Sequence, residues 1–157
     1  MLKTSFQYPY PLSWKETDIE EWKSADFSLI EVSLGKRTVP SFIYSSSYKP
    51  DEKIYALTLY FKIKTYGSGD VGVCYSPNFR LVLSEEGDLM SPINNRFNAE
   101  CLKRDRTYLD QEVIFVVPET EKEFYITTGG RSNIFFTVTV SENGDLEVEK
   151  VYNEEKG

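Results

Sequence analysis

Residues 53–65 read KIYALTLYFKIKT, and this stretch decides the fold class of the chain. Every second residue from Tyr55 to Ile63 is apolar, whereas Thr58, Lys62 and Lys64 occupy alternate positions and are polar. Such period-two alternation is typical of a strand that buries one face. The aromatic and β-branched residues in this stretch also favour strands. We therefore predict that residues 53–65 form the central strand of an all-β domain.

Shorter stretches on both sides carry similar strand signals, separated by turn residues. With residues 53–65 they give about nine predicted strands, at residues 27–34, 39–44, 53–65, 71–75, 79–83, 113–117, 124–126, 134–140 and 146–148. Turns are expected at Gly35-Lys36, at residues 67–70, 76–78, 86–88 and 128–130, and most clearly at Asn143-Gly144-Asp145. This spacing predicts an immunoglobulin-like β-sandwich of about 7–9 antiparallel strands with at most one or two short helices.

The ends of the chain and residues 91–111 do not follow this pattern. We expect residues 1–157 to form a single domain, with residues 1–25 as an N-terminal arm and residues 152–157 as a frayed tail. Ser13 and Glu16 have the spacing of a capping box, which predicts a short helix over Thr17–Ala25; the alternative is a strand that carries Trp14 and Trp22. Residues 91–111 are irregular, and either form a functional loop or contain a short helix near residues 98–103.

The composition argues against several classes of function. The chain has 18 Lys and Arg against 25 Asp and Glu, a formal charge of −7 and a pI near 4.8. Nucleic acids and anionic membranes bind through clustered cations, so we expect neither as the main partner. No apolar run approaches the roughly 18 residues that a membrane span needs. Histidine, the commonest general base and a common metal ligand, is absent. We expect no enzyme activity, no metal and no cofactor.

The sequence leaves the compartment and the cysteine chemistry open. The first residues, MLKTSFQYPYPLSW, lack the apolar segment of a signal peptide. Either the protein is cytoplasmic, or an export signal has been removed from the chain. Cys74 and Cys101 are the two cysteines. They either form a disulfide or remain free thiols.

The order of several segments resembles a known family. LGKRTVP at residues 34–40 and a polar loop precede KPDEKIYALTLYFKIKT at residues 49–65; NFRLVLSEEGDLMSP at 78–92 and LDQEVIFVVPETEKEFYIT at 109–127 follow. This order resembles the telokin-like, immunoglobulin-like domain of secreted and lipid-anchored bacterial proteins, over roughly residues 28–140. The resemblance implies an immunoglobulin-like fold, an extracytoplasmic setting, and a binding or structural role without catalytic residues.

Residues 101–108, CLKRDRTY, are the most distinctive local feature of the sequence. Lys103, Arg104 and Arg106 place three cations beside Tyr108 in an otherwise acidic protein. Such a group suits an acidic protein or an anionic sugar or lipid headgroup. We therefore take these four residues as the candidate binding site. The alternative is a solvated loop whose cations pair with carboxylates of the same chain.

Two weaker features leave other functions open. Glu85, Glu86 and Asp88 form either a solvated hairpin tip, which we favour, or a site for a hard cation such as Ca²⁺. Six tyrosines at or near positions expected to face solvent suit a sugar platform: Tyr44, Tyr48, Tyr60, Tyr66, Tyr75 and Tyr125.

We expect a non-catalytic binding or scaffolding domain at the bacterial cell surface, whose partner is a protein or another cell-surface component. The first alternative is a carbohydrate-binding module or a hydrolase that uses an aromatic sheet face. The second is a cytoplasmic adaptor that pairs through an edge strand.

Overall fold

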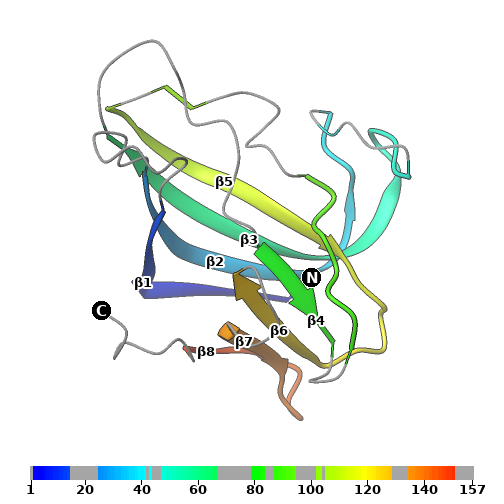
Figure 1. Cartoon of the computed structure of the whole chain (residues 1–157). Helices are drawn as coiled ribbons and strands as arrows, with labels where there is room; N and C mark the ends of the chain where they lie inside the picture. Colours follow the sequence, from blue (N-terminus) through cyan, green and yellow to red (C-terminus); the bar gives the residue numbers. More distant parts are fainter. Residues whose placement is uncertain are drawn as a thin grey trace.

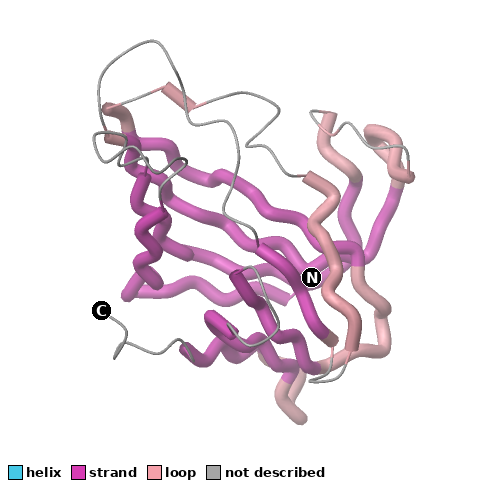
Figure 2. The backbone as a smooth tube through the Cα atoms, viewed as in Figure 1, coloured by secondary structure: helices cyan, strands magenta, loops and turns pink. Residues whose placement is uncertain are grey.

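The computed structural model describes residues 2–14, 25–41, 43, 47–66, 79–83, 87–94, 102–103, 105–128 and 134–150. These residues form the strands β1 (Leu2–Trp14), β2 (Ala25–Thr38), β3 (Lys53–Thr65), β4 (Phe79–Val82), β5 (Thr107–Val116), β6 (Glu123–Thr128), β7 (Ile134–Val140) and β8 (Leu146–Lys150). No helix occurs among the described residues (Figure 2). The prediction of an all-β chain is confirmed for this part of the protein.

The strands form two antiparallel sheets of four strands each. The larger sheet has the order β1-β2-β3-β5 and the smaller sheet the order β4-β6-β7-β8. Figure 1 shows the smaller sheet lying against one face of the larger one, with the chain crossing between the sheets before and after β5. This two-layer arrangement is consistent with the predicted β-sandwich.

The main core lies between the two sheets, and side chains of both sheets build it. Its buried members are Leu29, Val32, Leu34, Leu57, Leu59, Phe61, Ile63, Phe79, Leu81, Leu102, Val113, Phe115, Val117, Phe124, Ile126, Phe136, Val138 and Leu146. The rings of Phe61 in β3 and Phe79 in β4 stack with their centroids 5.0 Å apart, which joins the two layers directly. Burial of one such ring contributes about 1.5–3 kcal/mol.

Strand β3 has the bounds that the alternation predicts and occupies an interior position between β2 and β5. Its inner positions from Leu57 to Ile63 are buried in the main core. Its outer face is also buried at one end, where Ile54 and Ala56 pack with Val39, Ile43 and Ile114 in a second cluster. At the other end Lys62 and Lys64 are exposed on the outer face. The outer face of the larger sheet is therefore apolar and covered at one end but charged at the other.

The prediction of a strand over Val39–Tyr44 is wrong for the residues that the structure describes. The Val39 N–H donates to the Glu52 carbonyl at 2.8 Å, which extends the β2–β3 hairpin by one pair. The Ile43 N–H then donates to the Pro40 carbonyl at 3.2 Å, which closes a turn. The apolar side chains of Val39 and Ile43 cover the outer face of the larger sheet, so their burial does not require a strand.

Two other predicted boundaries also differ from the structure. The turn at Gly35-Lys36 is wrong, because β2 continues to Thr38 and Gly35 pairs with Ala56 of β3. The irregular stretch ends earlier than residue 111, because β5 begins at Thr107. Leu102 and Lys103 are not helical, while the rest of the predicted helix at residues 98–103 lies outside the described residues.

The N-terminal arm and the C-terminal hairpin follow the sequence more closely. Residues 2–14 are extended and pair with β2 as strand β1, so the strand alternative holds for Trp14. The Asn143-Gly144 turn joins β7 to β8 as predicted, with Gly144 at a φ of 86°. Of the helix predicted over Thr17–Ala25, Ala25 instead begins β2 and residues 17–24 lie outside the described residues. The predicted strand at 71–75 and the tail at 152–157 also lie outside them.

Candidate functional site

Thr65, the last residue of β3, fixes the loop that carries the predicted cations. Its side chain is fully buried. The Thr65 hydroxyl donates to the Lys103 carbonyl at 2.7 Å and accepts from the Arg106 N–H at 3.0 Å. The Thr65 N–H also donates to the Arg106 carbonyl at 2.8 Å. Three hydrogen bonds from one residue thus hold both ends of the loop on the end of β3.

Tyr108 gives the same loop a second attachment. The Lys103 N–H donates to the Tyr108 hydroxyl oxygen at 2.9 Å. The Tyr108 ring is half-buried and packs against the main core. Between the attachments Asp105 adopts a left-handed conformation with φ of 58°, which aspartate tolerates better than most residues. Tyr108, predicted as a binding residue, therefore has a visible role in positioning the backbone of Lys103.

Four exposed cations lie on the residues where β3 ends and just before β5 begins, and we call Lys62, Lys64, Lys103 and Arg106 the basic surface. Lys62 and Lys64 project from the outer face of β3. Lys103 and Arg106 belong to the loop that Thr65 and Tyr108 hold, and Tyr108 packs on the inner face of the sheet. Among the side chains that the structure describes, none pairs with these four in a salt bridge; the side chains of Asp26 and Asp110, whose backbones lie opposite Lys64 and Lys62, are outside that set. The Lys64 ammonium lies 5.4 Å from the centroid of the Tyr66 ring, within cation–π range.

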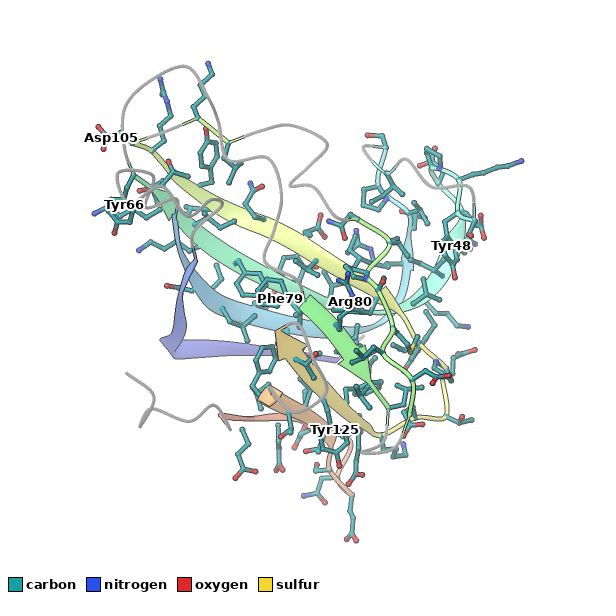
Figure 3. All side chains as sticks on the ribbon, in the orientation of Figure 1. Tyr48, Tyr66, Phe79, Arg80, Asp105 and Tyr125 are labelled. Carbon is teal, nitrogen blue, oxygen red and sulfur yellow. The ribbon has the colours of Figure 1, made fainter. Side chains whose placement is uncertain are left out.

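Figure 3 shows Tyr66 and Asp105 together at one end of the larger sheet, while Tyr48 lies at the opposite end. Asp105 is the exposed carboxylate of the loop itself, while Asp26 and Asp110 lie opposite Lys64 and Lys62 in the strand register. The structure thus places two predicted residues, Lys103 and Arg106, at the same end of the larger sheet as two that sequence reasoning missed, Lys62 and Lys64. Arg104 lies outside the described residues.

The basic surface has the chemistry to hold an anion without reacting with it. Arginine offers a planar fork of donors that matches a carboxylate or phosphate, and lysine offers a mobile point charge. Each contact at an exposed site contributes only about 0.2–1 kcal/mol and weakens with salt. Useful affinity therefore requires several cations acting together on a multivalent anion.

A second polar group lies on the outer face of the larger sheet, between the basic surface and the covered apolar end. The Arg37 guanidinium donates to the Glu112 carboxylate at 2.7 Å and to the Thr58 hydroxyl at 3.1 Å. The Arg37 and Glu112 side chains are only 16% and 17% exposed. Because the contacts run from β2 across β3 to β5, this group ties the three strands together.

The outer edge of β5 is occupied over part of its length. The Asn94 side chain donates to the Glu112 carbonyl at 2.7 Å and accepts from the Ile114 N–H at 3.0 Å. The Ile93 N–H donates to the Ile114 carbonyl at 2.8 Å. Residues 93–94 thus occupy the backbone groups that a neighbouring strand would bond, so this stretch of the edge is closed to pairing with another chain.

The structure describes only some of the other residues that the sequence singled out. Cys74, Cys101, Glu85 and Glu86 lie outside the described residues, and Asp88 is exposed. Of the six tyrosines, the four that the structure describes are all half-buried rather than exposed: Tyr48, Tyr60, Tyr66 and Tyr125.

Two searches of the structure give negative results for the residues described. No group of three or more His, Cys, Asp or Glu side chains among them is arranged to hold a metal ion. Nor do they form a helix long and apolar enough to cross a membrane.

The comparisons with known proteins do not identify a relative. No family model matches the chain, and neither a curated protein nor a solved structure matches it.

Proposed function

We propose that this chain is a non-catalytic, immunoglobulin-like binding or scaffolding domain that works at the bacterial cell surface and recognises an anionic partner through the basic surface. The observation that carries the proposal is the position of four exposed cations, Lys62, Lys64, Lys103 and Arg106, at one end of the larger sheet in a protein of net charge −7. Such a local excess of cations attracts anions against the overall charge of the molecule.

The way the loop is held supports a binding role. A surface that is ordered before binding loses less conformational entropy when the partner docks. Here the hydroxyls of Thr65 and Tyr108 fix the backbone at Lys103 and Arg106. The core between the sheets supplies the rigid frame beneath it, because Ile63 and Tyr108, paired in register, both pack there.

Binding to two multivalent anions tests the proposal. Poly-L-glutamate represents an acidic protein and polygalacturonate an anionic polysaccharide, and isothermal titration calorimetry measures both. The wild type should bind at least one of them at low ionic strength, and binding should be lost near 0.5 M salt. The double variant Lys103→Glu/Arg106→Glu should bind about tenfold more weakly, since two attractive contacts with the anion are replaced by repulsive ones.

The control is Lys49→Glu/Lys53→Glu, which changes the net charge equally but at exposed lysines near the start of β3. This control should retain wild-type affinity. An equal loss of affinity in both variants would show that only the net charge matters, and would contradict the proposal of a specific surface.

The cell-surface part of the proposal rests on the resemblance to telokin-like domains. An epitope tag on the complete gene product, followed by protease treatment of intact bacteria, tests it. Digestion of the tag in intact cells is expected. Protection until the cells are lysed would favour the cytoplasmic alternative.

A further inference from the structure

The outer face of the smaller sheet carries a row of carboxylates. In β6, β7 and β8 the inner positions Phe124, Val138 and Leu146 are buried in the main core, so the residues next to them face outward. Glu123 pairs with Thr139, which pairs with Glu147, so these three residues form one row across the outer face. Glu149 lies two positions beyond Glu147 on β8. Glu123, Glu147 and Glu149 are all exposed, and we call them the acidic surface.

Lys62 and Lys64 of the basic surface lie on the side of the sandwich opposite to the acidic surface. Phe61 and Ile63 of β3 are buried between the sheets, so Lys62 and Lys64 face away from the smaller sheet. The acidic surface faces away from the larger sheet for the same reason. Figure 3 shows this separation, with Tyr66 beside Lys64 at one end of the larger sheet and Tyr125 on the smaller sheet, in the row that Thr137 and Glu149 continue.

The two surfaces also match in spacing. Lys62 and Lys64 are two residues apart on one strand face, as are Glu147 and Glu149. Alternate residues of a strand are about 7 Å apart, so the two rows have the same repeat. An exposed leucine, Leu109, lies beside the cations, since the register shift in β5 leaves it opposite Lys62. A charged rim around an apolar contact is the usual composition of a protein interface.

From this complementarity we propose that the basic surface of one copy docks on the acidic surface of a second copy. The inference rests on the proposed function, since it names a second copy as the anionic partner of the same basic surface. Because the two contacting surfaces differ, the contact is heterologous and leaves one of each kind free at the ends of a dimer. The association therefore continues into longer head-to-tail oligomers. It depends on exposed ion pairs, so it is weak and sensitive to salt.

A charge-swap experiment tests the proposal by sedimentation velocity at low ionic strength. Variant A is Lys62→Glu/Lys64→Glu, and variant B is Glu147→Lys/Glu149→Lys. The wild type should sediment as a concentration-dependent mixture of monomer and oligomers, whereas each variant alone should be monomeric. An equimolar mixture of A and B should recover oligomers, because each variant offers a surface that the other complements. The Lys49→Glu/Lys53→Glu control should sediment as the wild type does.

Three results would overturn the inference: a monomeric wild type at 1 mM protein, variants that associate as the wild type does, or a mixture that stays monomeric. The first of these, found together with anion binding by the basic surface, would leave the proposed function standing. A wild type that neither associates nor binds anions would refute both the inference and the proposed function. Circular dichroism and thermal unfolding of A and B establish that each is folded, as expected for substitutions at exposed positions.

Discussion

Two buried threonines differ in what their hydroxyl groups bond to. Thr65 Oγ1 bonds to the backbone at Lys103 and Arg106, whereas buried Thr127 Oγ1 makes no hydrogen bond within the described structure. We predict that Thr65→Val lowers the free energy of unfolding by about 1–2 kcal/mol, because two backbone groups lose their partner. Thr127→Val should leave the free energy of unfolding unchanged or raise it, since the hydroxyl that this substitution removes is buried without a hydrogen-bond partner.

Urea denaturation of the two variants measures the difference through the midpoint at a constant m value. The same Thr65→Val protein should bind poly-L-glutamate more weakly, because the basic loop is then less ordered. Equal stability of the two variants would contradict the assignment of Thr65 as the anchor of the loop.

Asn94 protects the edge of β5 because its side-chain NH2 group donates to one backbone group there and its side-chain oxygen accepts from another. We predict that Asn94→Ala lowers the free energy of unfolding by about 1–3 kcal/mol, because the Glu112 carbonyl and the Ile114 N–H lose their partner. The opened edge should also promote aggregation. Denaturation and light scattering during heating measure the two effects. A stability of Asn94→Ala equal to that of the wild type would contradict the role of Asn94 at this edge.

At the scale of strands, Arg37 and Glu112 connect β2 and β5 across β3. Because the pair is mostly buried, its coupling should exceed that of an exposed ion pair. A double-mutant cycle with Arg37→Met and Glu112→Gln should give a coupling energy of about 1–2 kcal/mol by urea denaturation. A coupling within error of zero would mean that the pair does not stabilise the larger sheet.

Strand β3 was predictable because its inner face is buried from Leu57 to Thr65, and that burial produces a long alternation of residue types. The start of β5 was not predictable in this way. Between Tyr108 and Gln111 the register shifts by one residue, which leaves Leu109 and Asp110 opposite Lys62. A bulge of this kind interrupts the period of two, so a pattern search finds only the apolar run from Val113.

The candidate site was half predictable for a related reason. Lys103 and Arg106 were visible as a local excess of positive charge in an acidic sequence. Lys62 and Lys64 are some forty residues away in the chain and join them only through the pairing of β3 with β5. Strand register depends on contacts that are distant in sequence, and no local pattern encodes it. The positioning role of Tyr108 depends on the same folded geometry.

For the whole molecule, the distribution of charge matters more than its sum. The net charge of −7 predicts repulsion from anions, yet the cations of the basic surface lie at one end of the larger sheet, two of them on its outer face and two in the loop before β5. A sandwich separates its two outer faces by the thickness of both sheets, about 10 Å between the backbones. Local attraction at one face can therefore operate although the molecule as a whole is acidic.

The most direct test of the central claim is a residue-level map of anion binding. Titration of the ¹⁵N-labelled protein with poly-L-glutamate at low salt should shift the amide signals of Lys62, Lys64, Lys103 and Arg106, with saturation at a common affinity. Signals of the equally exposed Lys49 and Lys53 should not move. Shifts that follow Lys49 and Lys53, or that spread over all lysines alike, would contradict the claim that this surface is where the protein recognises its partner.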